Sequence, residues 1–152
     1  SIPLTISNLS NLKELELFSN QLSGNIPKDI GSLSQLTVLS LSSNELSGML
    51  PSSIYNLKEL KTLSLFDNKL FGSLHSNIAS LSNLEELLLS DNLFYGNVPF
   101  EISELTNIKV VMLNNNDLKG DFEALASAIP ANVKFEYQNL NSESNSVVVG
   151  TD

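Results

Sequence analysis

A pattern of apolar and polar positions returns every 24 residues along the chain. Each copy has the spacing LxxLxLxxN, in which aliphatic residues hold the three leucine positions. Side chains alternate along a β-strand, so Leu15 and Leu17 are expected to point inward while Glu14 and Glu16 point outward. The period predicts a stack of similar units, each contributing one short strand to a parallel sheet. The asparagines that close the copies are Asn20, Asn44, Asn68, Asn92 and Asn116.

The second half of each copy contains a glycine and, in three copies, an apolar residue followed by proline. Glycine permits a turn that a Cβ would hinder, and proline fixes φ on the segment that follows. Residues 27–33, with Ile30 and Leu33 three apart, predict a short helical or 3-10 turn. The asparagines are expected to bond backbone groups that the turn leaves unpaired, so we assign them a structural role.

These residues resemble the plant-type leucine-rich repeat, LxxLxxLxLxxNxLxGxIPxxLxxL. The match is close over residues 12–33, where Gly24 precedes Ile26 and Pro27. The resemblance implies an α/β solenoid: a right-handed superhelix with a parallel β-sheet on the concave side and short helical or 3-10 turns on the convex side. The family includes ectodomains of receptor-like kinases and receptor-like proteins, inhibitors of cell-wall-degrading enzymes and ice-binding proteins. It therefore implies recognition and signalling, and it favours an extracellular or cell-surface location.

The repeat changes toward the C-terminus. Asp121 is expected to cap a helix over residues 123–129. Residues 133–137 alternate apolar and charged side chains in phase with the earlier strands, which predicts a degenerate sixth strand at which the sheet ends. We expect a leucine-rich repeat domain over residues 1–140, with a half repeat, five 24-residue repeats and a degenerate terminal repeat, followed by a disordered tail over residues 141–152. Because the chain opens within a repeat and without Met, we interpret it as a fragment of a longer protein.

Composition and charge narrow the possible partners. The formal net charge is −9 and all eight basic residues are scattered lysines, which excludes a nucleic-acid or anionic-membrane surface. The absence of cysteine excludes disulfides and thiolate chemistry. No apolar run approaches the roughly 20 residues that a membrane-spanning helix needs. The acidic residues form no dense ligand loop, so neither a metal nor another cofactor is expected.

Catalytic chemistry lacks the residues that it needs. His75 is the single histidine, and it takes the place that proline holds in three other repeats, so we interpret it as a turn residue rather than a base. Without cysteine or arginine, neither a thiolate nucleophile nor a guanidinium clamp is available. Neighbouring carboxylates such as Glu85 and Glu86 diverge along a strand and imply no deep cleft. The sequence therefore predicts that the protein is not an enzyme.

The outward strand positions are those that the repeat leaves free to vary, so a binding site is expected there. Leu88, Val110 and Met112 are expected to lie together on this solvent-facing surface, as in a protein or peptide binding site. Drift, or contact with a neighbouring chain, would leave the same pattern. The other candidate contact residues are Phe18, Phe66, Glu86, Asp67 and Asp91.

Two further surfaces have more than one interpretation. Asp67 and Asp91, on adjacent rungs about 5 Å apart, would receive a basic side chain of a partner or form a solvated acidic rim. Phe71 and Tyr95 share a later column, where they would either form a patch on the flank or cover the edge of the core, and we favour packing. Asn8 begins the sequon Asn-Leu-Ser and is a possible glycosylation site.

Recognition of a protein or peptide on the concave strand face is the first functional hypothesis. The alternative is an ice-binding or cell-wall surface protein. Ice recognition needs a flat, regular array of small polar side chains. Ser40, Ser42 and Ser64 offer a fragment of such an array, which Phe66 and Leu88 interrupt.

Overall fold

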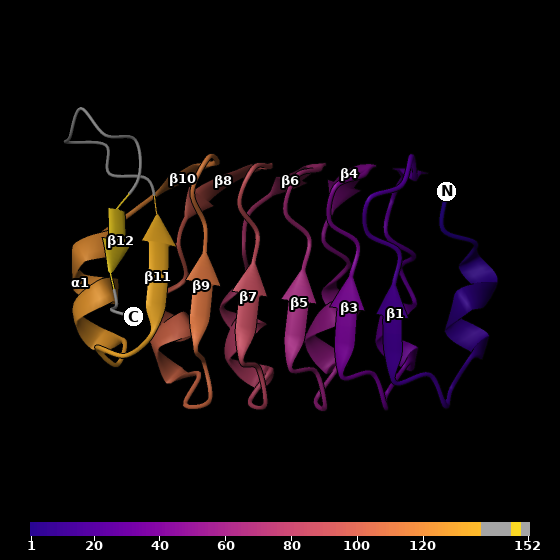
Figure 1. Cartoon of the computed structure of the whole chain (residues 1–152), viewed down its shortest axis with the longest axis horizontal. Coiled ribbons are helices and arrows are strands. Elements are labelled where there is room, and N and C mark those ends of the chain that lie inside the picture. Colours follow the sequence, from indigo (N-terminus) through magenta and orange to yellow (C-terminus); the bar gives the residue numbers. More distant parts are fainter. Residues whose placement is uncertain (138–146, 150–152) are drawn as a thin grey trace.

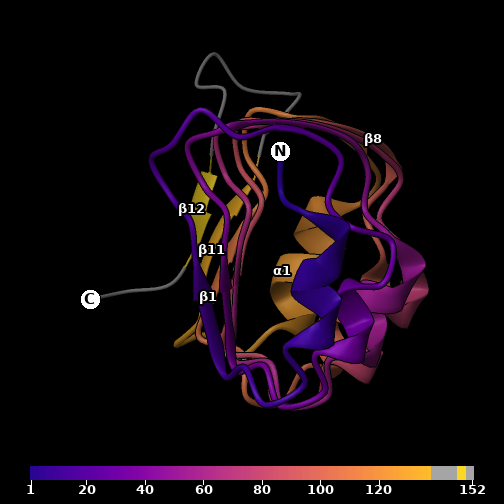
Figure 2. The same cartoon turned by 90° about the vertical axis from the view of Figure 1, so that its right-hand side faces the viewer.

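The chain forms a row of coils that stack side by side along one axis (Figure 1). The computed structural model describes residues 1–137 and 147–149. Each full coil contains a short strand, a turn, a second strand and a 3-10 helix. Viewed along the axis, the first strands form one side of the molecule and the 3-10 helices form the opposite side (Figure 2). This is the solenoid that the period predicts.

Within residues 1–137 and 147–149, the main sheet has seven strands. Its order is β1 (Glu14–Glu16), β3 (Val38–Ser40), β5 (Thr62–Ser64), β7 (Glu86–Leu88), β9 (Val110–Met112), β11 (Lys134–Tyr137) and β12 (Val147–Val149). From β1 to β11 the strands are parallel. Each strand residue pairs with the residue 24 positions away in the next strand, as Leu15 does with Leu39. The inward leucines are buried, and Leu39, Leu63 and Leu87 have no exposed surface. The predicted register and core are confirmed.

The opposite side of the coils is made of short helices. These are η1 (Leu4–Asn8), η2 (Ile30–Ser32), η3 (Ser52–Asn56), η4 (Ser76–Ser80) and η5 (Phe100–Glu104). Pro51 and Pro99 stand directly before η3 and η5 with φ of −66° and −71°, the range that the proline ring imposes. The predicted 3-10 turns are therefore confirmed. Within the described residues, no helix is long and apolar enough to cross a membrane.

A second parallel sheet joins the coils along their upper rim (Figure 1). Its strands are β2 (Ser23–Gly24), β4 (Glu45–Met49), β6 (Lys69–Gly72), β8 (Leu93–Asn97) and β10 (Asp117–Lys119). The 24-residue pattern did not predict this sheet. Glycine, which is depleted in strands, lies within four of these segments, and its φ is positive, for example 99° at Gly72. The glycines confirm the predicted turn, but because glycine is depleted in strands they gave no sign of the strands around it.

The repeated asparagines tie neighbouring coils together. The Asn68 amide nitrogen donates to the carbonyl of Leu65 in its own coil, at 3.1 Å, and to that of Leu41 in the preceding coil, at 3.0 Å. Its Oδ1 accepts from the N–H of Leu46 at 2.9 Å. Asn44, Asn92 and Asn116 repeat this pattern. The predicted structural role is confirmed, and each side chain also bonds the backbone of the coil before it.

The C-terminal end is closed by a helix and two strands. Asp121 caps α1 (Phe122–Ala128) by accepting from the N–H of Ala124 at 2.8 Å, as predicted. Phe122 stacks on Tyr137 with ring centroids 5.0 Å apart, which covers the last coil with aromatic surface. The expectation that the sheet ends with the sixth strand is wrong, because β12 pairs antiparallel with β11. The rest of the predicted tail lies outside the described residues, and the domain boundary remains a prediction.

The asparagine ladder predicts a measurable loss of stability. Asn92 is buried, so Asn92→Ala leaves the N–H of Leu70 and the carbonyl of Leu65 without this partner and without water. We expect the free energy of unfolding, from chemical denaturation, to fall by about 2–3 kcal/mol. Asn20→Ala is the control, because the Asn20 side chain is exposed and donates only within its own coil. An equal loss in both variants would contradict the inter-coil role.

Candidate functional site

The solvent-facing side of the main sheet, which we call the strand face, holds the predicted binding residues. Leu88 and Met112 are direct partners in the register of β7 and β9. Val110 lies two residues before Met112 on the same face of β9, and its partner in β7 is Glu86. All four side chains are partly exposed. The structure therefore brings together the apolar cluster that the sequence predicts.

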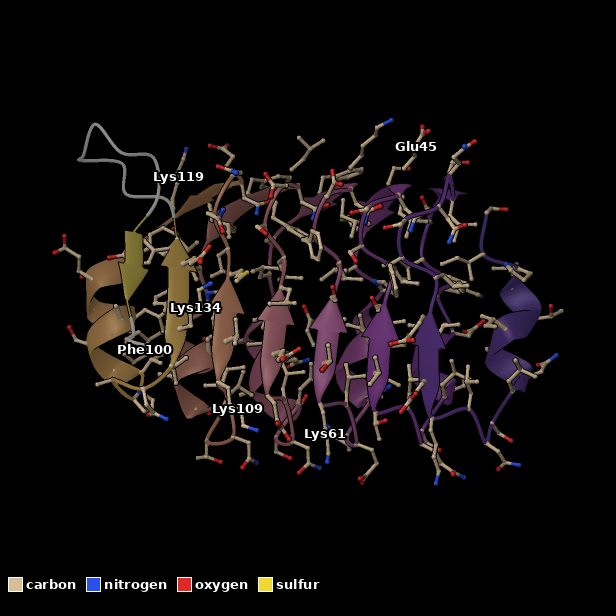
Figure 3. All side chains as sticks on the ribbon, viewed as in Figure 1. Glu45, Lys61, Phe100, Lys109, Lys119 and Lys134 are labelled. Atoms are coloured by element: carbon tan, nitrogen blue, oxygen red, sulfur yellow. The ribbon has the colours of Figure 1, made fainter. Side chains whose placement is uncertain are left out.

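Charged groups border this apolar cluster on two sides. On the β5 side, the Glu86 carboxylate accepts from the hydroxyl of Thr62 at 3.3 Å. On the other side, Lys134 and Glu136 of β11 form an ion pair at 2.9 Å. Lys134 is labelled beside β11, the strand next to β9, in Figure 3. Three apolar side chains are thus held between fixed charges on a rigid sheet.

Three serines of the strand face are far less accessible than their outward position suggests. Ser42, Ser64 and Ser90 are only 4%, 5% and 7% exposed. Small side chains on a sheet become covered when larger ones stand on neighbouring rungs, as Phe66 does beside Ser42 and Ser90. Their hydroxyls therefore do not form an open array.

The two aromatic residues of the strand face do not form one contact surface. Phe18 is 52% exposed at the first rung, whereas Phe66 is partly buried two rungs away. Ser42 stands between them in the column. The structure therefore groups Phe66 with the middle rungs and leaves Phe18 apart from the apolar cluster.

Asp67 and Asp91 occupy a strained turn position. Their φ values are 56° and 55°, in the left-handed region, and Ser19, Ser43 and Asn115 share this conformation. Aspartate and asparagine tolerate it better than most side chains, which gives these residues a structural reason to be there. Asp91 also accepts from the Asn115 amide at 2.7 Å. Both carboxylates are exposed, so they also contribute negative charge at the end of the strand face.

The outer face of the second sheet presents apolar side chains to solvent. Met49, Phe71 and Leu93 are successive register partners across β4, β6 and β8. Phe71 is 41% exposed, and Tyr95, on the same face of β8 as Leu93, is 49% exposed. This exposure favours the flank patch over the packing interpretation of Phe71 and Tyr95.

An ion pair on the lower edge of the coils shifts the pKa of both partners. Lys109 and Glu85 come from successive coils, and Lys109 donates a hydrogen bond to the Glu85 carboxylate. This hydrogen bond and the charge of Lys109 lower the pKa of Glu85, and Glu85 in turn raises the pKa of Lys109. Lys61 lies along the same edge (Figure 3) and lowers the pKa of Glu85 further.

The remaining candidate residues have local roles. His75 stands directly before η4 and its Nδ1 accepts from the N–H of Asn77 at 3.1 Å, which confirms it as a turn residue. Among the described residues, no group of three or more acidic or histidine side chains is placed to hold a metal ion. Asn8 is exposed at the end of η1, and its glycosylation remains a prediction.

The sequence of the coils matches a model of the leucine-rich repeat region over residues 4–135. The chain belongs to the leucine-rich repeat family. No curated protein sequence matches it. The family is therefore established by the repeat itself and by solved structures.

Several solved structures resemble this leucine-rich repeat chain. The ectodomain of the membrane receptor kinase GASSHO1/SCHENGEN3 from Arabidopsis thaliana, in complex with CASPARIAN STRIP INTEGRITY FACTOR 2, is 36% identical with a TM-score of 0.80, and the match covers 91% of this chain and 17% of that chain. The Arabidopsis receptor kinase HAESA, in complex with the peptide hormone IDA and the co-receptor SERK1, is 35% identical with a TM-score of 0.75, covering 78% and 20%.

A plant ice-binding protein is also similar, with 31% identity, a TM-score of 0.81 and coverage of 90% of this chain and 45% of that one. The leucine-rich repeat chain thus spans about a fifth of the two receptor chains and less than half of the ice-binding protein. These similarities identify plant-type repeats.

The edge ion pair predicts a pH effect with a defined sign. A lowered carboxyl pKa in the folded state means that the pair stabilises the fold at neutral pH and that this contribution is lost as the pH falls through the pKa of Glu85. Lys109→Gln should raise the pKa of Glu85 toward its ordinary value, measured by NMR titration of the carboxyl carbon. Lys69→Gln, which removes the Glu45 pair instead, should leave it unchanged. An unchanged Glu85 titration in Lys109→Gln would refute the assignment.

Proposed function

We propose that this chain is a recognition module that binds an extended peptide or protein segment across the strand face. The observation that supports this most is the apolar cluster of Leu88, Val110 and Met112, held in register on a surface that faces solvent. Apolar side chains on such a surface gain free energy only when a partner covers them. Recognition rather than catalysis also agrees with the lack of cysteine and arginine and with the role of His75 as a turn residue.

The sheet that carries this apolar cluster is already ordered before a partner binds. Its strands are bonded on both sides, and the asparagine ladder fixes the turn at the end of each strand. A preorganised surface loses little conformational entropy on binding, so a modest apolar area suffices for affinity. Receptor kinases with similar repeats support this function, since HAESA is described in complex with a peptide hormone and a co-receptor.

The charge of the strand face specifies the partner further. Glu14, Glu16, Glu86 and Glu136 point outward from its strands, and Asp67 and Asp91 stand at their ends. The one lysine among the outward strand positions of the described residues, Lys134, is paired with Glu136. A complementary segment therefore has apolar side chains flanked by lysine or arginine. Such a partner would bind faster and more tightly at low ionic strength.

The experiment is a selection of displayed random peptides on the purified chain, followed by affinity measurements of the selected peptides. We expect basic peptides with apolar centres, and we expect Leu88→Asp with Met112→Asp to weaken them at least about tenfold, because two charges would be buried unpaired. Leu93→Asp is the matched control, since Leu93 is an exposed leucine of the second sheet. Equal binding by both variants, or selection of acidic peptides, would overturn the proposal.

Ice binding is the second candidate, because one similar protein is a plant ice-binding protein. Its physical requirement is an open, regular polar array, and the burial of Ser42 and Ser64 removes two members of the array on the strand face. We therefore expect no thermal hysteresis from the purified chain in a nanolitre osmometer. Concentration-dependent hysteresis would reverse the ranking of the two functions.

A further inference from the structure

Four residues depart from the repeat on the side of the coils opposite the strand face. His75 takes a proline position, and Tyr55 takes a position that is small in the other coils. Met49 takes a position where the other coils have short polar side chains, and Lys28 takes one that is serine in two other coils and apolar in two. The residues equivalent to Tyr55 are Gly31, Ala79 and Ser103; those equivalent to Met49 are Asn25, Ser73 and Asn97; those equivalent to Lys28 are Leu4, Ser52, Ser76 and Phe100.

These four departures line a single cleft of about 520 Å³ between the second sheet and the 3-10 helices. This volume is within the range of small-molecule sites. Tyr55 comes from η3, and its hydroxyl accepts from the backbone N–H of His75 at 3.3 Å. The two rings lie 6.1 Å apart. Residues that break the repeat in different coils are therefore in contact with one another or face the same cavity.

Three side chains of the cleft can donate hydrogen bonds to a ligand. The Tyr55 side chain is buried, and burial raises the pKa of its phenol, so the hydroxyl keeps a proton that it can donate. The imidazole of His75 uses Nδ1 to accept from Asn77, which places the proton of the neutral ring on Nε2. Lys28 adds an ammonium group to the wall.

The charge of the cleft is opposite to that of the chain as a whole. The chain has a net charge of −9, yet none of the eleven residues that line the cleft has a carboxylate. The apolar part of the wall comes from Ile26, Met49, Leu50 and Pro51. Lys28 is the only residue of the wall with a permanent positive charge. A ligand that matches this wall is negative at one end and apolar at the other.

We propose that this cleft binds a small organic anion, in which a phosphate, sulfate or carboxylate group meets Lys28 and the Tyr55 hydroxyl while an apolar body rests on Met49 and Leu50. The site is separate from the strand face and does not depend on peptide binding there. Lys28 and Tyr55, which meet the anionic group, come from neighbouring coils, and both depart from the repeat.

The test is an NMR titration of the whole chain with phenyl phosphate, with phenol and inorganic phosphate as single-group probes. We expect saturable amide shifts around Lys28, Tyr55 and His75 with phenyl phosphate, and at least about tenfold weaker binding of phenol and of inorganic phosphate. Lys28→Ser and Tyr55→Phe should each weaken phenyl phosphate about tenfold. Lys28→Ser places in the coil the residue that two other coils have, so folding is not at risk.

Two control variants distinguish binding in this cleft from binding elsewhere on the chain. Lys13→Thr removes a lysine remote from the cleft, and Thr37 shows that the position accepts threonine, so it should not change binding. The Leu88→Asp and Met112→Asp variant should also bind phenyl phosphate normally, whatever it does to peptides. Shifts that do not saturate, that phenol reproduces, or that Lys28→Ser leaves intact would overturn the proposal.

Discussion

The buried amide of the repeated asparagine is the interaction on which the rest of this structure depends. Main-sheet strands of three residues leave most of each coil as turn, and buried backbone groups in a turn must find a partner or cost free energy. One asparagine satisfies backbone groups of two coils at once. Its amide nitrogen donates to a carbonyl of its own coil and to a carbonyl of the preceding coil, and its oxygen accepts from the N–H just before a strand of the second sheet. Neither a shorter nor a charged side chain offers both functions at that distance.

This constraint separates fixed positions from free ones. Inward leucines, asparagines and glycines are determined by the coil, and the residue before each asparagine is held near φ 55° whatever its side chain. The coil does not determine the outward strand positions, nor several positions at the end of the second-sheet strands and in or before the 3-10 helices. Both candidate surfaces lie at such positions. The strand face gathers Leu88, Val110 and Met112, and the cleft gathers Lys28, Met49, Tyr55 and His75.

The features that the sequence predicted are those that recur in phase. The pairing of Val111 with Phe135 follows from the period alone, and the Asp121 cap follows from a local rule of helix geometry. The second sheet could not be found this way, because its strands contain glycines at positive φ and pair 22 residues apart instead of 24, as Ser47 and Lys69 do. The pairing of β12 depends on a return of the chain that no repeat specifies.

The columns of surface residues were predicted from the sequence, but the exposure of their side chains was not. The sequence placed Leu88 beside Met112, since column order follows from register. It could not show that Ser42 and Ser64 are covered, because exposure depends on the size of neighbours in other coils. It treated His75 as an isolated substitution, because Tyr55, its contact, is 20 positions away, which is not a multiple of the repeat. Departures from a repeat become informative when the coil geometry brings them together.

The two surfaces also differ in the sign of their charge, and this difference constrains which ligands each can bind. The strand face combines apolar side chains with carboxylates, whereas the cleft on the opposite side is lined without any. A solenoid transmits little between such faces, because each coil contacts only its neighbours. A ligand in the cleft therefore does not change the arrangement of β7 and β9, and the two ligands are expected to bind independently.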